Sequence, residues 1–152
     1  METMIARCSG LDVHKASVTA CVRLIVDGVV RELIETSGTT TPDLLALRDW
    51  LAAHEVTHVA MESTGVYWKC VYYVLEDDFE LLLVNAQHIK HVPGRKTDAI
   101  DAAWIAQLLA CGLLRGRLVP PPRIRELRDL TRYRKALIYE RSRAVNRPAQ
   151  AA

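Results

Sequence analysis

The stretch ASVTACVRLIVDGVVRELIET, residues 16–36, decides how the fold begins. Before the Asp27-Gly28 pair, apolar and polar side chains alternate, which predicts a strand. Asp-Gly is a typical tight hairpin turn, so the residues after it are predicted to form the returning strand. An apolar segment, residues 5–13, precedes the hairpin and is predicted to be a buried strand with Asp12 near its C-terminal end. The chain therefore begins as an antiparallel meander of three strands.

Downstream of the meander, the pattern changes to helices that alternate with strands. A helix is predicted to start at Thr41-Pro42-Asp43, with Thr41 as its cap. Further strands are predicted at residues 56–62 and 79–85, and further helices at residues 65–77 and 97–111. Strand–helix–strand units imply parallel pairing. The sequence therefore predicts an α/β fold, in which a mixed sheet combines the antiparallel three-strand meander with parallel strands and is flanked by helices.

Each of these helices has an expected inward face. The inward residues are predicted to be Leu44, Leu47 and Leu51 in the first helix, and Tyr67, Val71, Val74 and Leu75 in the second. In the third helix, Asp98 and Asp101 share a face that continues as Ile105 and Leu108. Both aspartates are therefore expected at the rim of the core.

The C-terminal part of the chain differs from the rest. The proline run at residues 120–122 is predicted to be a stiff connector, and residues 123–147 to be one long helix. Apolar residues in this helix fall close to a 3-4 spacing, which is weakly typical of a coiled coil. We therefore expect one domain at residues 1–119, followed at residues 120–152 by the connector and the start of a basic, coiled-coil-like helix.

The composition excludes several classes of protein. Half of the 152 residues are hydrophobic, which is enough for a core in a single domain. No apolar run approaches the roughly 20 residues of a membrane span, and the N-terminus has no signal-peptide pattern. The four cysteines are scattered without a CxxC pair, so we expect them to be reduced core residues of a cytoplasmic protein.

Charge is divided unevenly along the chain. Residues 1–92 have 7 Lys and Arg against 13 Asp and Glu, whereas residues 93–152 have 13 against 5. The basic part suggests contact with a polyanion such as nucleic acid, although a solvated basic helix face explains the charge equally well. The candidate nucleic-acid-binding residues are Lys15, Arg95 and Lys96 beside the acids, and Arg125, Arg128, Arg132 and Lys135 on the long helix.

Four acidic residues occupy comparable places in the predicted fold. Asp12 and Glu62 each end a strand, where sites form in open α/β sheets, and Asp98 and Asp101 lie in the first turn of a helix. Taken singly, each acid has a structural explanation as a cap or turn residue. Taken together, they would repel one another unless cations neutralise them, and oxygen ligands suit Mg²⁺ or Mn²⁺. We expect a metal site, and two such ions about 3.5–4 Å apart would support phosphoryl transfer.

His14 lies close to the first of these acids. We expect its side chain and that of Asp12 to point to opposite faces of the strand, which argues against a shared role.

The motifs GLDVHK, AMESTGVYW, LVNAQHIK and GRKTDAIDAAWIAQLL resemble the N-terminal domain of the DEDD transposases of bacterial insertion sequences, a group that includes the pilin gene-inverting recombinases. The resemblance covers about residues 9–147. It implies an RNase-H-like fold similar to the Holliday-junction resolvase RuvC, and it places the family's acidic tetrad on Asp12, Glu62, Asp98 and Asp101. The implied activity is metal-dependent cutting and joining of DNA at the ends of a mobile element, with a guide RNA as a further partner.

The resemblance also implies a second domain that carries a serine nucleophile and, for the full-length protein, a homo-oligomer. The tail NRPAQAA departs from the family pattern, so we expect the chain to be truncated there and assign the serine role to no residue. Two alternatives to a catalytic transposase domain remain. One is a non-catalytic nucleic-acid-binding remnant, and the other is a stand-alone nuclease that resembles junction resolvases.

Overall fold

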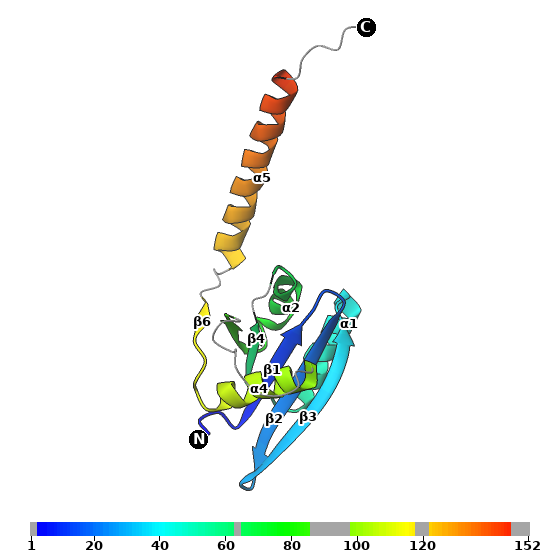
Figure 1. The fold of residues 1–152 in the computed structure, drawn as a ribbon, viewed down its shortest axis with the longest axis vertical. Helices are drawn as coiled ribbons and strands as arrows, with labels where there is room; N and C mark the ends of the chain where they lie inside the picture. The colour runs from blue at the N-terminus through cyan, green and yellow to red at the C-terminus, as the bar shows by residue number, and fades with distance from the viewer. Residues whose placement is uncertain (1–2, 63–64, 86–97, 118–121, 147–152) are drawn as a thin grey trace. The chain divides into compact units, whose positions relative to one another are not determined.

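The computed structural model describes residues 3–62, 65–85, 98–117 and 122–146. The chain divides into two compact units, Met1–Arg117 and Leu118–Ala152. In the described ranges, the first unit contains the sheet and the helices that flank it, and the second contains one long helix (Figure 1).

The first unit is built on a six-stranded sheet with the order β3-β2-β1-β4-β5-β6. The strands are β1 (Arg7–Val13), β2 (Ser17–Val26), β3 (Val29–Gly38), β4 (His58–Glu62), β5 (Glu80–Val84) and β6 (Gly116–Arg117). The first three strands pair antiparallel, and β4 pairs parallel with both β1 and β5. The predicted mixed sheet is therefore confirmed. The strand β6, which pairs antiparallel with β5, was not predicted, because two residues carry no periodic pattern.

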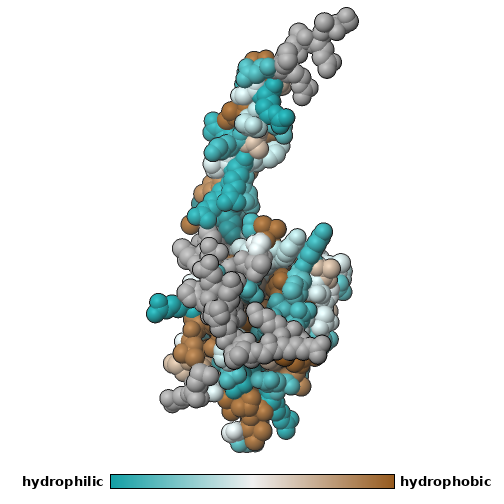
Figure 2. Space-filling view, viewed as in Figure 1, coloured by the Kyte–Doolittle hydropathy of each residue, from teal (hydrophilic) through white to brown (hydrophobic). Residues whose placement is uncertain are grey.

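The hairpin between β2 and β3 forms where the sequence predicts it. Asp27 and Gly28 have φ angles of 51° and 76°, the left-handed conformation that the tightest hairpin turns require. Across the two strands, Arg23 Nη1 donates to Glu32 Oε1 at 3.0 Å. The strand β3 has no neighbour on its outer side within the described sheet, and apolar side chains are exposed along it and at the turn (Figure 2).

Within the described residues, the helices of the first unit are α1 (Thr41–Ala53), α2 (Trp68–Leu75) and α4 (Asp98–Ala110). In Figure 1, α4 crosses in front of β1 and β2, whereas α1 lies behind β3. The close approach of α4 depends on Gly10, because a Cβ atom there would overlap the Ala102 carbonyl and the Ala106 amide. Cys8 lies on the same face of β1, and its Sγ is 3.5 Å from the Ala106 carbonyl oxygen.

The first two helices form where the sequence predicts them, but the cap of α1 and one inward residue of α2 differ from the prediction. The predicted buried leucines of α1 are all buried, but the cap is Thr40 rather than Thr41: its Oγ1 accepts from the Asp43 amide at 3.4 Å. Tyr67 was predicted to point inward and is 43% exposed, because it precedes α2 and lies outside the helical stripe. The core side of α2 is instead formed by Val71 and Leu75.

The buried face of α4 is shifted from the predicted one. Its buried residues are Ala102, Ile105, Ala106, Leu109 and Ala110, while Leu108 is half-buried. Asp98 lies four residues before Ala102 and so continues the buried stripe toward the start of the helix. Asp101 lies at the edge of this stripe. Gly112, with φ of 68°, follows the helix as predicted. The predicted cap of this helix, Thr97, lies outside the described residues.

The second unit is described by α5 (Pro122–Val145), so Pro122 opens the helix rather than belonging to the connector. None of the helices in the described ranges is both long and apolar enough to cross a membrane. The four cysteines are free, but only Cys8 and Cys21 belong to the core, while Cys70 is exposed. The expectation that all four are core residues was therefore wrong.

Candidate functional site

Two of the predicted acids meet at one edge of the sheet because β1 and β4 run parallel. Leu11 pairs with Met61, so Asp12 and Glu62 follow one residue later on neighbouring strands. Side chains alternate along a strand, which places Asp12 on the same face as Gly10, the face that α4 covers. Ala60 of β4 packs with Ile105 of α4, so it lies on the same face. Glu62 follows Ala60 by two residues and therefore also lies on this face.

The helix α4 brings a third acid to this edge. Its first residue, Asp98, lies at the head of the buried stripe, beyond the last apolar contact with the sheet. The Asp98 side chain is 57% exposed, whereas the Asp12 side chain is only 7% exposed. The Asp12 carboxylate is therefore held inside the protein, whereas that of Asp98, which we expected with Asp101 at the rim of the core, faces solvent.

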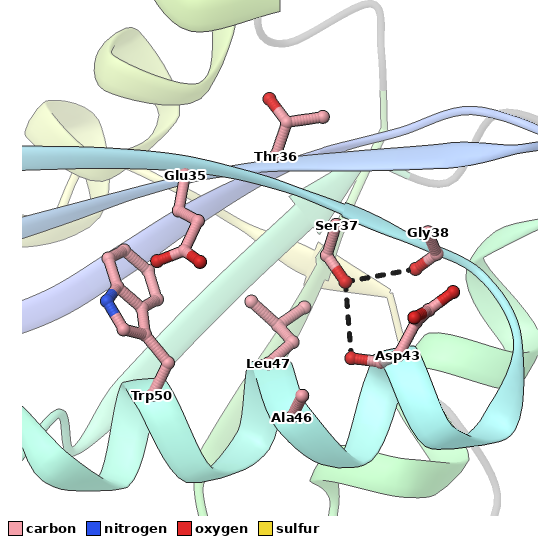
Figure 3. A pocket seen from close by; sticks show the side chains of 8 residues that line it. All are labelled: Glu35, Thr36, Ser37, Gly38, Asp43, Ala46, Leu47 and Trp50. Carbon is pink, nitrogen blue, oxygen red and sulfur yellow. Dashed lines mark hydrogen bonds between the residues drawn. The ribbon is translucent and has the colours of Figure 1, made fainter.

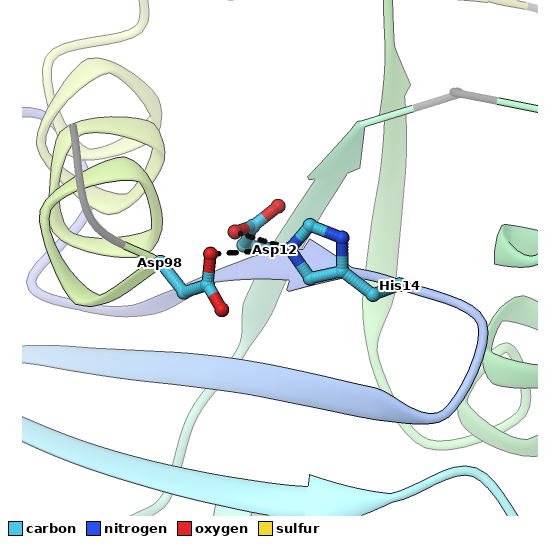
Figure 4. A group of neighbouring side chains, drawn as sticks. All are labelled: Asp12, His14 and Asp98. Atoms are coloured by element: carbon cyan, nitrogen blue, oxygen red, sulfur yellow. Dashed lines mark hydrogen bonds and ion pairs between the residues drawn. The ribbon is translucent and has the colours of Figure 1, made fainter.

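A histidine joins these two carboxylates. His14 Nε2 lies 3.1 Å from Asp12 Oδ2 and 3.2 Å from Asp98 Oδ1. Figure 4 shows the imidazole ring turned toward both acids, with Asp12 and His14 coming from the end of β1 and Asp98 from the start of α4. The expectation that His14 and Asp12 point to opposite faces was wrong. Residues two apart share a face of an extended chain, and this spacing was the signal that could have found His14.

Burial sets the electrostatics of this site. Loss of solvent raises the pKa of Asp12 from 3.8 to about 6, although His14 acts in the opposite direction. The negative charges of Asp98 and Asp101 raise the pKa of Asp12 further. Burial lowers the pKa of His14, but the two neighbouring carboxylates outweigh this effect, so the pKa lies above its ordinary value. A buried carboxylate among other acids favours the approach of a cation.

The remaining predicted ligands lie around this group. Glu62 and Asp101 are both half-buried, and Asp101 is close enough to influence the pKa of Asp12. Asp12, His14 and Asp98 form the group whose ligand atoms all lie within 4.8 Å of one another. The carboxylate oxygens of Asp12 and Asp98 are the kind of ligand that Mg²⁺ and Mn²⁺ prefer.

The predicted nucleic-acid-binding residues fall into three groups. Lys15 is exposed in the turn after β1, where its carbonyl accepts from Thr39 Oγ1 at 3.0 Å. Arg95 and Lys96 lie outside the described residues. Arg125, Arg128, Arg132 and Lys135 follow a 3-4 spacing and so share one face of α5.

The rest of α5 is more mixed than this face. The helix contains eight Lys and Arg against three Asp and Glu. Large apolar side chains are exposed along it as well, among them Leu127, Leu130 and Leu137 (Figure 2). The basic face suits contact with a polyanion, and the exposed apolar side chains elsewhere on the helix suit contact with protein.

A cavity of about 270 Å³ lies between the end of β3 and α1 (Figure 3). Ser37 Oγ lies 3.2 Å from the carbonyl oxygens of Gly38 and Asp43, and the Trp50 ring closes the other end. The charged side chains among the described residues that line this cavity, Glu35 and Asp43, are both acidic. The cavity is therefore unsuited to phosphate groups.

The sheet order and the helix across its face place the chain in the RuvC-like class of RNase-H-like folds. The RuvC protein of T. thermophilus, solved in complex with a Holliday junction substrate, has a TM-score of 0.52 and 13% identity, covering 74% of this chain and 99% of that one. A second structure of Thermus thermophilus RuvC gives a TM-score of 0.50 and 12% identity, covering 73% and 99%. At this identity the likeness establishes the fold alone.

The family follows from a separate comparison. The family model described as a transposase, of the DEDD type of IS110 elements, matches residues 9–151. The chain therefore belongs to the DEDD transposase family. The comparison with curated proteins gives no match.

Proposed function

We propose that this chain is the metal-dependent catalytic domain of a DNA transposase, which cuts and joins DNA strands at the ends of a mobile element. Membership of the DEDD transposase family supports this function. The observation that carries the proposal is the convergence of Asp12 and Asp98, which are 86 positions apart in the chain, on the two sides of His14. A buried carboxylate with a raised pKa at this edge destabilises the fold, and a bound cation would relieve it.

Each acid has a distinct role in this proposal. Asp12 and Asp98 hold the metal, and Glu62 and Asp101 complete the ligand set from the neighbouring strand and helix turn. Two bound Mg²⁺ or Mn²⁺ ions would stabilise the attacking and the leaving oxygen of the strand transfer. The rigid pairing of β1 with β4 fixes Asp12 and Glu62 relative to each other, so that the phosphodiester is held in one orientation.

DNA contact is assigned to two sets of basic residues. Lys15, with Arg95 and Lys96, would bind phosphates next to the acids, and the basic face of α5 would bind the backbone without reading sequence. A guide RNA is proposed as a second polyanionic partner. Self-association is proposed to use the exposed apolar side chains of α5. We place the protein in the cytoplasm, where thiols such as buried Cys8 and Cys21 stay reduced.

The test is cleavage of labelled DNA by the 152-residue chain with Mg²⁺, with Mn²⁺ and with EDTA. A four-way junction and a linear duplex of the same sequences serve as substrates, because the similar RuvC structure contains a Holliday junction. Asp12→Asn should abolish cleavage while leaving DNA binding intact. The matched control is Asp49→Asn, which removes the same charge from an exposed position on α1.

The outcomes separate the candidate functions. Metal-dependent cleavage that Asp12→Asn removes supports the catalytic domain. Cleavage confined to the four-way junction would instead favour a stand-alone nuclease that resembles resolvases. Salt-sensitive binding without cleavage under any condition would contradict the catalytic proposal and leave a nucleic-acid-binding remnant.

A further inference from the structure

The strongest unassigned feature of the site is His14, which is not one of the four predicted acidic ligands although it lies two residues after Asp12. It follows β1, and its backbone amide donates to the Ser17 carbonyl at 2.9 Å, which fixes the turn into β2. The imidazole extends from this turn back over the end of β1 toward α4 (Figure 4). The histidine thus lies in a turn that is closed by a backbone hydrogen bond between two paired strands.

The Nε2 atom of His14 lies between the carboxylates of Asp12 and Asp98. His14 Nε2 contacts Asp12 Oδ2 at 3.1 Å and Asp98 Oδ1 at 3.2 Å, so a single nitrogen is shared between two carboxylates from different elements. Ligands next to each other around an octahedral ion with bonds of about 2.1 Å stand about 3 Å apart. The nitrogen therefore already lies at ligand spacing from both oxygens.

We propose that His14 Nε2 is a direct metal ligand, which with Asp12 and Asp98 forms a mixed nitrogen–oxygen site. This inference rests on the proposed metal-dependent function. On metal binding, the hydrogen on Nε2 leaves to solvent, and the neutral ring keeps its other hydrogen on Nδ1.

The chemical consequence is a change of metal preference. Mn²⁺ shares the preference of Mg²⁺ for oxygen ligands, but as a first-row transition metal it accepts an imidazole nitrogen more readily, whereas Mg²⁺ keeps much of its water. A site of carboxylates alone would discriminate little between Mg²⁺ and Mn²⁺. A site that includes His14 should therefore bind Mn²⁺ more tightly than Mg²⁺, and removal of the ring should lower the affinity for Mn²⁺ more than that for Mg²⁺.

The direct test is pulsed electron paramagnetic resonance of the Mn²⁺-loaded chain, which detects modulation of the electron spin echo by a coordinated ¹⁴N nucleus. The wild-type chain should show this modulation, and His14→Gln should lose it. The control is His58→Gln, because His58 opens β4 at the end away from Glu62 and its Nδ1 contacts Thr57 Oγ1. Calorimetric titration should give about a tenfold or greater loss of Mn²⁺ affinity in His14→Gln, with less than about a threefold change for Mg²⁺.

Failure of this inference is distinct from failure of the proposed function. Mn²⁺ that binds the wild type and depends on Asp12, but shows no ¹⁴N modulation, would overturn the ligand role of His14 and leave the acidic site standing. The absence of any Mn²⁺ binding would overturn both. The spectrum of the wild-type chain decides the matter even if His14→Gln does not fold.

Discussion

Replacement of Asp12 by asparagine should make the metal-free protein more stable. The Asp12 side chain is only 7% exposed, and burial raises its pKa from 3.8 to about 6. Because the folded pKa lies above the unfolded one, the folded state binds the proton more tightly. The stabilisation from protonated Asp12 is complete below about pH 4 and is lost as the pH rises through about 6.

The change in the free energy of unfolding follows from the raised pKa of Asp12. Each pKa unit corresponds to about 1.4 kcal/mol, so ionised Asp12 costs on the order of 3 kcal/mol at pH 8. The asparagine carries no charge and keeps one oxygen to accept the hydrogen of His14 Nε2. The pKa of about 6 already includes the contact of Asp12 with His14, so this contact is not subtracted again. Asp12→Asn should therefore raise the free energy of unfolding by up to about 3 kcal/mol at pH 8.

Urea denaturation in EDTA, at pH 8 and at pH 4, measures both parts of this prediction. The free energy of unfolding of Asp12→Asn should exceed that of the wild type at pH 8, and this difference should largely disappear at pH 4. Asp49→Asn should change the free energy of unfolding little at either pH, because Asp49 is exposed. Added Mn²⁺ should make the wild type the more stable of the two proteins, since an ion at about 1,000 times its Kd stabilises the wild type by about 4.1 kcal/mol. A variant no more stable than wild type at pH 8, or a gain independent of pH, would refute the reasoning.

Three further predictions concern packing, capping and DNA contact. Gly10→Ala should lower the free energy of unfolding by about 1–3 kcal/mol and weaken Mn²⁺ binding, because the new Cβ would push α4 from the sheet. Gly28→Ala, where the added Cβ meets open space but φ is positive, should cost about 1 kcal/mol in thermal unfolding and leave Mn²⁺ binding unchanged. Thr40→Ala should cost about 1 kcal/mol in urea denaturation, because the amide at the start of α1 loses its acceptor. Arg128→Ala should weaken DNA binding equally for all sequences and lower the salt slope by about 1 in fluorescence anisotropy, whereas Arg48→Ala should not.

The fold was largely predictable because its signals are local. The alternation before Asp27-Gly28 and the turn itself determine the hairpin within a few residues, and both strands form as predicted. The leucine spacing of α1 predicted its buried face for the same reason. The cap was misplaced by one residue because Thr40 and Thr41 are chemically equivalent, and only the backbone conformation selects between them.

The site was less predictable because it depends on packing between distant segments. The four acids could be proposed from their places at strand and helix ends, but the sequence could not show that Asp12 is buried while Asp98 faces solvent. That difference depends on how far α4 extends past the sheet. The contact of His14 with Asp98 spans 84 positions, so no local pattern encodes it. The contact with Asp12 is local, and it was missed through a mistaken assignment of strand faces.

The same contact builds the core and the candidate site. Gly10 admits α4 to the surface of β1, and the stripe from Ala102 to Leu109 fixes the helix there. Since Asp98 is the first residue of that helix, its distance from Asp12 is set by the packing of α4 rather than by a flexible loop. The ligands are therefore held near each other before an ion arrives, which lowers the entropy cost of binding it.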